Sequence, residues 1–449
     1  MRTSLFSRKK RQRGVSLLMV ALALVALIAM AALSIDVASL YTARGEAQRA
    51  ANAAALAGAK MFVSSGYTTA PAAWGDPTKV CSTTGPGSVA AANKQAEAAA
   101  AANLIAGQPA QVQSITCDLT RSGNPNIKVT VQRLNLPIFF ARIWGNAATT
   151  VTATATAEAY NPSNNGLSTP QPFSVTAVKP WLVPNCNPNI SSPGPCPSGY
   201  FINPADGSIL NNGEIGSTIA LNRILSKPDM AGGTGGGGMN FYGLVYPDPP
   251  APVCPSASSV SCGPPVGGGT SYIDNIACAS TQPFRCGEPI VPSDQAGIQA
   301  ESTTVSGTPT RVGARCLIHA DDDGFGQGQD AFSTSGDPGD PATITGGYNN
   351  PNPSLRGAPN ISRSDSVITV PLYDGTQLCT SVGQCHTSAT VIGFLQLGIK
   401  RTIPAGPEIE AVVLNAVGCS PALVSGFPPS NPISIGGTSP IPVRLIQLP

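Results

Sequence analysis

The chain has 449 residues, a formal net charge of +2, 48 glycines and 43 prolines, while only 11% of its residues are charged and 5% are aromatic. This composition favours turns and short strands over long helices, yet an apolar fraction of 42% is enough for a folded core, and the length allows two or three domains. The near-neutral charge excludes a strongly basic nucleic-acid-binding surface, so we expect no nucleic-acid partner.

The first 35 residues have the composition of a membrane anchor. Residues 1–14 hold six arginines and lysines and no acidic residue, and residues 15–35 then run for 21 positions without an ionisable side chain. As a helix this run rises about 31 Å, which matches the hydrocarbon core of a bilayer. The positive-inside rule predicts a single-pass membrane protein with a cytoplasmic N-terminus and its bulk outside the cytoplasm.

A cleaved secretory signal is the alternative for the same segment. Ala29, Met30 and Ala31 would pass as a small-residue cleavage site after a short apolar core. The apolar run continues past Ala31, however, and a helical pattern without proline extends to about Phe62. Cleavage sites are normally recognised in extended chain, so we expect the helix to be retained.

Residues 36–62 predict an alanine-rich helix that continues from the span. At 100° per residue its apolar or small positions form one stripe, consisting of Leu40, Ala43, Ala47, Ala50, Ala51, Ala54, Gly58 and Met61. Ala59 is expected on the opposite face. Because small residues let backbones approach closely, the stripe predicts packing against either a partner helix or the protein's own domain.

The rest of residues 36–160 predicts a small α+β domain. A helix is expected over residues 88–106, starting at Ser88. Alternation of apolar and polar residues predicts strands over residues 112–121, 126–136 and 149–160. The apolar plug of this domain is expected to consist of Phe139, Phe140, Ile143 and Trp144.

The C-terminal two thirds of the chain predict loops and strands in place of long helices. Residues 161–365 are rich in Gly, Pro and Cys and predict loops and short strands, and residues 366–449 predict a C-terminal β region. Its strands are expected over residues 366–373, 388–401 and 408–417. The predicted fold class is α+β: a transmembrane helix continuing into an alanine-rich helix, a small α+β domain, and a mainly β, disulfide-bonded region outside the cytoplasm.

All twelve cysteines, from Cys81 to Cys419, follow the predicted span. An even number in an exported region predicts disulfides, whose connectivity the sequence cannot prove. Pairing between neighbours is our leading expectation, with the pairs Cys186–Cys196, Cys254–Cys262, Cys278–Cys286 and Cys379–Cys385. A metal-binding role is weakly supported because no Cys-x-x-Cys spacing occurs.

Residues 319–330 carry a pattern that could bind a metal. With Gly324 as the sharp-turn glycine, Asp321, Asp323 and Asp330 occupy the third, fifth and twelfth places of a calcium loop. Against this reading, the flanks are not clearly helical and Asp-Gly is a common turn dipeptide, so a solvated acidic turn is the alternative. No other cofactor is expected.

The sequence offers little for catalysis. His319 and His386 are the only histidines, and neither lies in a nucleophile elbow or a zinc-protease motif. We therefore expect that the protein is not an enzyme, and a secreted hydrolase is the weakest alternative.

The N-terminal residues also carry a family resemblance. Arg13 to Ser16, Ile35 to Ala38 and the alanine-rich run Ala50 to Ala59 resemble the N-terminal module of TadG-like proteins of Flp (tight adherence) pilus assembly. Two departures are visible: Asn52 stands where the family usually has Asp, and the Asp-x-Ser-x-Ser motif of a von Willebrand A-type domain is missing. A pilin-like Glu is also missing, because Met19 occupies its place, so prepilin processing is not expected.

The resemblance implies a membrane-anchored accessory or structural component of Flp pilus assembly, or of a related envelope secretion system. It places the expected single-pass span in the inner (cytoplasmic) membrane, with the bulk of the protein periplasmic or extracellular. Its implied partners are other pilus-assembly proteins of the membrane or envelope. A membrane-tethered surface adhesin or calcium-dependent binding protein is the alternative.

Overall fold

A computed structural model gives the architecture. It describes residues 9–71, 75–83, 85–121, 123–138, 140, 148–163, 173–186, 200–210, 214–223, 238–246, 271–280, 282–292, 299–300, 308–321, 328–333, 343–361, 363–374, 389–403, 409–419, 433–434 and 439–446.

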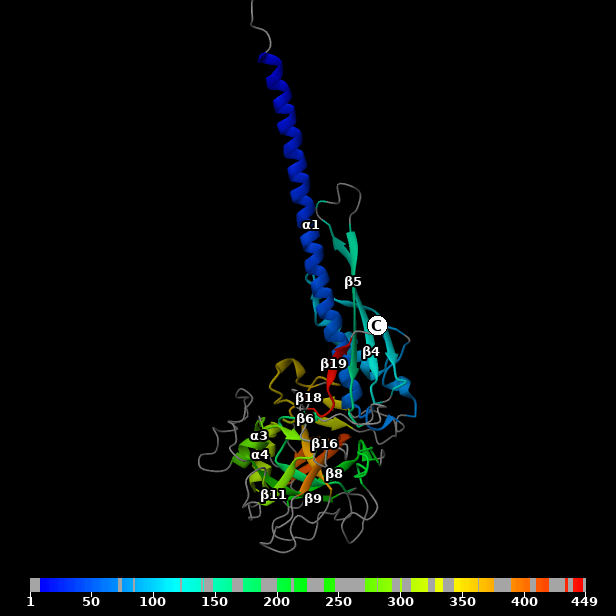
Figure 1. Ribbon diagram of the computed structural model, residues 1–449, viewed down its shortest axis with the longest axis vertical. Helices are drawn as coiled ribbons and strands as arrows, with labels where there is room; N and C mark the ends of the chain where they lie inside the picture. The colour runs from blue at the N-terminus through cyan, green and yellow to red at the C-terminus, as the bar shows by residue number, and fades with distance from the viewer. Residues whose placement is uncertain are drawn as a thin grey trace, which may run out of the picture.

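One long helix dominates the molecule. Helix α1 runs without interruption over Lys9–Ser64, so the predicted span and the predicted alanine-rich helix form a single element. Its first half projects away from the rest of the protein, and its second half lies against a sheet (Figure 1). This division matches the sequence, because bulky apolar residues fill the first half and alanines the second.

An antiparallel four-stranded sheet supports the second half of α1. Its strand order is β19-β5-β4-β3, with bounds Val443–Ile446, Ala148–Ala159, Asn126–Pro137 and Gln111–Asp118. Ile127, Val129 and Val131 are fully buried in β4, as their alternation with polar residues predicts. Strand β19 comes from the end of the chain and completes the sheet beside β5.

Helix α2 is shorter than the helix predicted over residues 88–106. It spans Ala91–Ala101, and Ser88 precedes it with its Oγ accepting a hydrogen bond from the N–H of Ala90. The chain then turns at Ala106 and Gly107, both with positive φ. The strands β1 (Leu104–Ile105) and β2 (Gln108–Pro109) flank this turn as a small hairpin.

A mixed eight-stranded sheet forms the centre of the remaining chain. Its order is β11-β12-β9-β7-β15-β16-β17-β8, with bounds Pro289–Pro292, Gln299–Ala300, Gly238–Val245, Trp181–Pro184, Val367–Tyr373, Ala389–Thr402, Ile409–Gly418 and Thr218–Arg223. The last three predicted strands are present as β15, β16 and β17. Strands from residues 161–365 and from residues 366–449 share this one sheet, and the α+β class is confirmed.

Smaller elements cover the large sheet. Helices α3 (Ser271–Ala277) and α4 (Thr308–Leu317) bury Tyr272, Ile276 and Ala314 with the sheet residues. A separate cluster joins Phe332 and Ile344 to β17, and these two residues lie in the hairpin of β13 (Ala331–Ser333) and β14 (Thr343–Thr345). Other short elements are β6 (Phe173–Val175), β10 (Phe284–Arg285), β18 (Ile433–Ser434) and the 3-10 turns Pro77–Lys79 and Pro353–Leu355.

The end of α1 docks directly on the large sheet. Asn415 of β17 is fully buried, and its Nδ2 donates to the carbonyl of Val63 at 2.6 Å, while its Oδ1 accepts from Thr69 Oγ1 at 3.1 Å. Phe62 and Val417 belong to one continuous core. The helix is therefore coupled to the β-rich region by packing and by buried hydrogen bonds.

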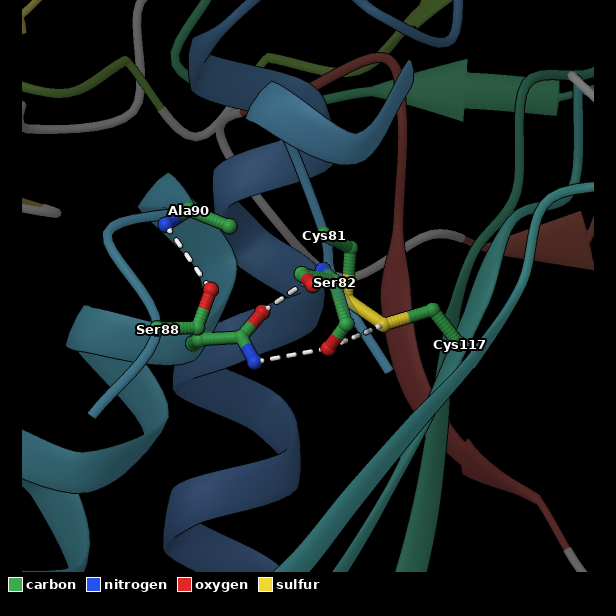
Figure 2. The surroundings of a disulfide bond; sticks show 6 residues. Cys81, Ser82, Ser88, Ala90 and Cys117 are labelled. Atoms are coloured by element: carbon green, nitrogen blue, oxygen red, sulfur yellow. Dashed lines mark hydrogen bonds between the residues drawn. A yellow bond between two sulfur atoms is a disulfide. The ribbon is translucent and has the colours of Figure 1, made fainter. Parts of the chain in front are cut away.

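Two disulfides have both partners within the described part of the chain. Cys81–Cys117 ties the segment before α2 to β3, with a Cα–Cα distance of 6.2 Å (Figure 2). Beside it, the buried side chain of Asn93 pairs with the backbone of Ser82, accepting from its N–H at 3.0 Å and donating to its carbonyl at 2.8 Å. The disulfide and the amide pair together fix this segment between β3 and α2.

The second disulfide corrects one predicted pairing. Cys286 is bonded to Cys419, with a Cα–Cα distance of 5.4 Å and a sequence separation of 133, and not to Cys278. The N–H of Cys419 donates to Ile392, and the N–H of Gly287 donates to Val391, so β16 draws both cysteines together. Such pairing across a sheet leaves no mark in local spacing.

Each of the other three predicted neighbour pairs includes a cysteine outside the described residues. Cys186, Cys278 and Cys316 are also disulfide-bonded. Cys196, Cys254, Cys262, Cys379 and Cys385 lie outside the described residues. Among the cysteines that the structure covers, none is free.

Loss of the Cys286–Cys419 bond is expected to destabilise the β-rich region. Its closed loop is long, and removing a native disulfide typically costs about 2–5 kcal/mol. Converting both residues to alanine should lower the thermal midpoint, and peptide mapping of the parent protein should recover the Cys286–Cys419 and Cys81–Cys117 links. Recovery of a Cys278–Cys286 link from native protein would contradict the observed connectivity.

Candidate functional site

The first half of α1 exposes an apolar surface. Within the part of the chain that the structure covers, α1 is the one helix long and apolar enough to cross a membrane, and 6% of its most apolar window is buried. Large side chains of residues 15–35 such as Leu17 and Val25 are more than half exposed. A core helix of a globular domain would bury such residues, so this segment fits a single-pass membrane anchor.

Asp36 marks the end of the apolar surface. Its side chain is only 2% exposed although it sits on a projecting helix, and Oδ2 accepts a hydrogen bond from the backbone N–H of Phe140 at 3.0 Å. Phe140 closely follows the end of β4, and the strands β4 and β5 run along α1 (Figure 1). The backbone amide supplies the partner that a buried carboxylate requires.

Phe140 itself does not act as the predicted apolar plug. Its side chain is 36% exposed at the end of the hairpin. The plug expectation is wrong for this residue, because its backbone N–H is held by Asp36 on the projecting helix α1 and its side chain is not enclosed by the domain core. Phe139, Ile143 and Trp144 lie outside the described residues.

The alanine stripe packs inside the protein's own domain. Ala47, Ala50, Ala51 and Ala54 are fully buried, and α1 contacts β4, β5 and α2 at this level. Of the two alternatives that the sequence left open, packing on its own domain is therefore the observed one. The buried arc is wider than the stripe, because the sheet and α2 cover different sides of the helix.

Ala59 was expected on the opposite, open face of α1, and this expectation is wrong. Its side chain is 0% exposed and belongs to the main core. The periodicity of one helix cannot show that two separate elements pack against it. A leucine at position 59 would therefore disturb the core, as it would at the stripe positions.

Gly58 marks the closest approach of α1 to its neighbours. A Cβ built on Gly58 would lie 2.7 Å from Cδ1 of Ile127 in β4, 3.2 Å from the carbonyl oxygen of Ala92 and 3.4 Å from Cβ of Ala96 in α2. These distances leave little room for a side chain. The glycine thus lets helix, helix and strand meet at one point.

Substitutions of Gly58 and Gly45 are expected to distinguish the effect of packing on stability from the effect of helix propensity. Gly58→Leu should destabilise the protein by about 1–3 kcal/mol, because the new side chain overpacks the contact with Ile127 and α2. Gly45, in the same helix, has nothing within 4 Å of its ideal Cβ. Gly45→Ala should therefore be neutral or stabilising by up to about 1 kcal/mol, through helix propensity. Similar denaturation midpoints for the two variants would contradict a tight contact at Gly58.

The acidic loop converges on one turn. Asp330 is 5% exposed; its Oδ1 accepts from the N–H of Gly347 at 2.8 Å and from Nδ2 of Asn350 at 3.0 Å. The exposed Asp321 accepts from Nδ2 of Asn349 through its Oδ1. Two of the three predicted ligands, Asp321 and Asp330, thus bond to neighbouring residues of the 347–350 turn. The third, Asp323, lies outside the described residues.

These contacts give the two carboxylates different characters. Asp330 already receives hydrogen bonds that hold a buried carboxylate in place, whereas Asp321 is open to solvent. Over the described residues, no group of three or more His, Cys, Asp or Glu side chains is placed to hold a metal ion. A calcium site here would therefore need ligands in addition to Asp321 and Asp330.

A buried polar cluster beside this loop was not found by sequence reasoning. His319, which has a positive φ, places Nε2 3.0 Å from Oδ2 of Asp365. The hydrogen bond from His319 lowers the pKa of Asp365, and the neighbouring charges add to this effect. Lys179 is 5% exposed, and its Nζ donates to the carbonyls of Ile276 and Cys278 at 2.7 Å each.

Burial lowers the pKa of Lys179 to about 7, although the charge of Asp365 opposes the shift. The lysine holds the C-terminal end of α3, whose carbonyls have no partners within the helix. No sequence spacing links residues 179, 319 and 365. These contacts are typical of a structural network, because Lys179 bonds to two backbone carbonyls and Asp365 bonds to His319.

The projecting apolar helix, the sheet that supports its second half and the disulfide-bonded β-rich region define an α+β protein whose N-terminal helix fits a single-pass membrane anchor. Residues 14–61 match the family described as "Putative Flp pilus-assembly TadE/G-like". This match confirms the resemblance predicted from the N-terminal residues, and it indicates involvement in Flp pilus assembly at the level of the family. The family is one of pilus-assembly components and not one of enzymes.

The match lies within α1 and does not extend to the β-rich region. No curated protein and no solved structure matches the chain. The part of the molecule outside α1 must therefore be interpreted from its own residues.

Proposed function

We propose that the protein is a single-pass, membrane-anchored structural component of Flp pilus assembly, or of a related envelope secretion system. The family match within α1 carries this proposal, because the matched residues include both the apolar span and the alanine-rich half that docks on the sheet. The mechanism is structural: α1 anchors the protein, and the β-rich region contacts pilus or envelope components.

The proposed orientation places the N-terminus in the cytoplasm of the inner membrane and the β-rich region outside. Six basic residues before the span support it through the positive-inside rule. The disulfides Cys81–Cys117 and Cys286–Cys419 also support it, since such bonds persist in oxidising compartments.

The rigid junction between α1 and β17 suits a structural role. Asn415 bonds to Val63 and Thr69, and its Nδ2 also donates to Oε1 of Gln396 at 2.7 Å. A buried network of this kind fixes the orientation of the large sheet relative to the helix. A movement of α1 would therefore be passed directly to the β-rich region, because no flexible linker separates the two at this contact.

Photo-crosslinking in cells tests the proposal. A photo-reactive amino acid at Tyr348, which is 67% exposed on the β-rich region, reports the partner there, and the same group at Val89, which is 83% exposed beside α2, reports the small domain. We expect crosslinks from at least one position to pilus-assembly or envelope proteins, absent from cells that lack those proteins. Unchanged piliation after deletion of this chain, together with no such crosslink, would contradict the proposal.

A membrane-tethered adhesin or calcium-dependent binding protein is the second candidate, and the convergence of Asp321 and Asp330 on one turn favours it over a hydrolase. If the acidic loop binds calcium, Ca²⁺ should raise the thermal midpoint more than Mg²⁺ does, because Ca²⁺ accepts a flexible shell of many oxygens. Extracellular sites bind at about 10⁻⁴ to 10⁻³ M, so the titration must reach tens of millimolar.

Asp321→Asn should abolish the calcium-dependent shift while leaving the metal-free midpoint nearly unchanged, because Asp321 is exposed. Asp330→Asn is unsuitable for this purpose, since Asp330 also supports the 347–350 turn. A midpoint that does not respond to Ca²⁺, or a response that survives Asp321→Asn, would leave the loop as a solvated turn.

A further inference from the structure

The β4–β5 hairpin reaches the level at which α1 leaves the apolar span. We propose that this end of the hairpin, at Phe140, is a second membrane contact that enters the boundary between lipid headgroups and acyl chains beside α1. The inference rests on the proposed retention of α1 as a membrane anchor, and it adds an interaction surface that the helix alone does not provide.

The hydrogen bond between Asp36 and Phe140 fixes the height of the contact. Asp36 is the first ionisable residue after the uncharged run of residues 15–35, which is long enough to cross the hydrocarbon core. Its Oδ2 holds the N–H of Phe140 at 3.0 Å. Once the run is inserted, Phe140 must therefore lie near the membrane surface.

The bond also keeps the hairpin from lifting away. Asp36 is 2% exposed, so its bond to the N–H of Phe140 is shielded from competing water, which strengthens it. The long strands β4 and β5 hold the hairpin along α1 (Figure 1). The position of Phe140 is thus set from both sides, by the sheet and by the helix.

The side chains at this level suit an interface better than a water-exposed surface. Phe140 is 36% exposed, and on α1 the exposed fractions of Val37 and Tyr41 are 41% and 71%. Phe140 and Tyr41 are aromatic in a chain that is only 5% aromatic, and the exposed Arg44 follows Tyr41 by about one turn of α1. Aromatic rings at the headgroup level, with basic residues near them, are typical of membrane interfaces.

A lipid surface is the occupant that these observations favour. The contact is continuous with the exposed apolar surface of α1, and lipid surrounds that surface wherever the span is inserted. A second copy of the chain or another membrane protein would have to displace this lipid. The two possibilities are separable by asking which quencher reaches Phe140.

Fluorescence quenching in vesicles tests the proposal with the full-length chain. Phe140→Cys, Leu24→Cys and Tyr348→Cys are each labelled with an environment-sensitive fluorophore and reconstituted in phosphatidylcholine–phosphatidylglycerol vesicles, after the parent protein has been shown to take up no label. Phe140→Cys keeps the bond to Asp36, which uses the backbone N–H. Leu24 lies in the span, and Tyr348 is 67% exposed on the β-rich region.

We expect lipid-attached quenchers to reduce emission at positions 24 and 140 by at least twofold and to leave position 348 unchanged, while aqueous iodide should quench position 348 strongly. Quenching of position 140 by iodide alone would overturn the proposal, and so would protection from both quenchers, which indicates a protein partner. Loss of lipid quenching at position 24 as well would instead show that α1 is not inserted, which would contradict the anchoring on which the proposal depends.

Discussion

Replacing Gly66 by alanine is expected to destabilise the protein by about 2–5 kcal/mol, combining backbone strain with overpacking. Gly66 lies in the turn after α1 with a φ of +76°, a conformation that residues with a Cβ rarely adopt. A Cβ there would also lie 2.8 Å from the carbonyl oxygen of Leu414 in β17 and would clash with Ile215. The backbone oxygen cannot move without disturbing the sheet, so the helix and the β-rich region would be forced apart.

Gly107 provides a matched control for this substitution. Its φ of +75° is almost the same as that of Gly66, but nothing lies within 4 Å of its ideal Cβ. Gly107→Ala should therefore show the cost of the left-handed backbone alone, about 1–2 kcal/mol. Thermal or urea denaturation in detergent measures both variants. Equal losses of stability would mean that the close approach of Gly66 to β17 has no energetic weight.

The second large effect is expected from the pH dependence due to Lys179. Its folded-state pKa is about 7 because of burial, whereas a lysine in the unfolded chain titrates near 10.4. Between these values the unfolded state binds more protons, so stability should rise with pH, by up to about 1.4 kcal/mol per unit. Below pH 7 both states are protonated, and the folded protein carries the full cost of the buried charge.

Lys179→Met should remove this rise in the free energy of unfolding. The variant loses the bonds to Ile276 and Cys278, so it should be less stable than the parent at pH 9, and the difference should shrink toward pH 7. Lys94→Met, on the exposed side of α2, is the control and should follow the parent. Urea unfolding can be followed by the fluorescence of the buried Trp181. Parallel pH curves for the parent and Lys179→Met would contradict the assignment.

Local patterns predicted much of the fold. The uncharged run, the alanine stripe and the alternation in β4 each repeat with the period of one helix or one strand, and those periods are visible in the sequence. Predicted strands therefore agree with β3, β4, β5, β15, β16 and β17 to within a few residues. The family resemblance could likewise be recognised from the sequence, because its motifs lie within one continuous helix.

The candidate site was less accessible from sequence. Asp321 and Asp330 do approach one turn, but Asn349 and Asn350, which hold them, could not be identified from spacing within the loop. The cluster of Lys179, His319 and Asp365 was missed altogether. Its members come from three distant segments, and a lone buried lysine or histidine carries no periodic signal.

The sequence by itself determined the apolar span, the buried stripe of α1 and the positions of six strands, because each depends on side chains repeating along one element. Only the tertiary structure decided that β19 returns to the first sheet, that Cys286 bonds to Cys419 and that Ala59 is buried. These features depend on contacts between elements far apart in the chain. Backbone hydrogen bonds, which nearly every residue can form, set strand pairing, so the local sequence does not reveal which distant partners meet.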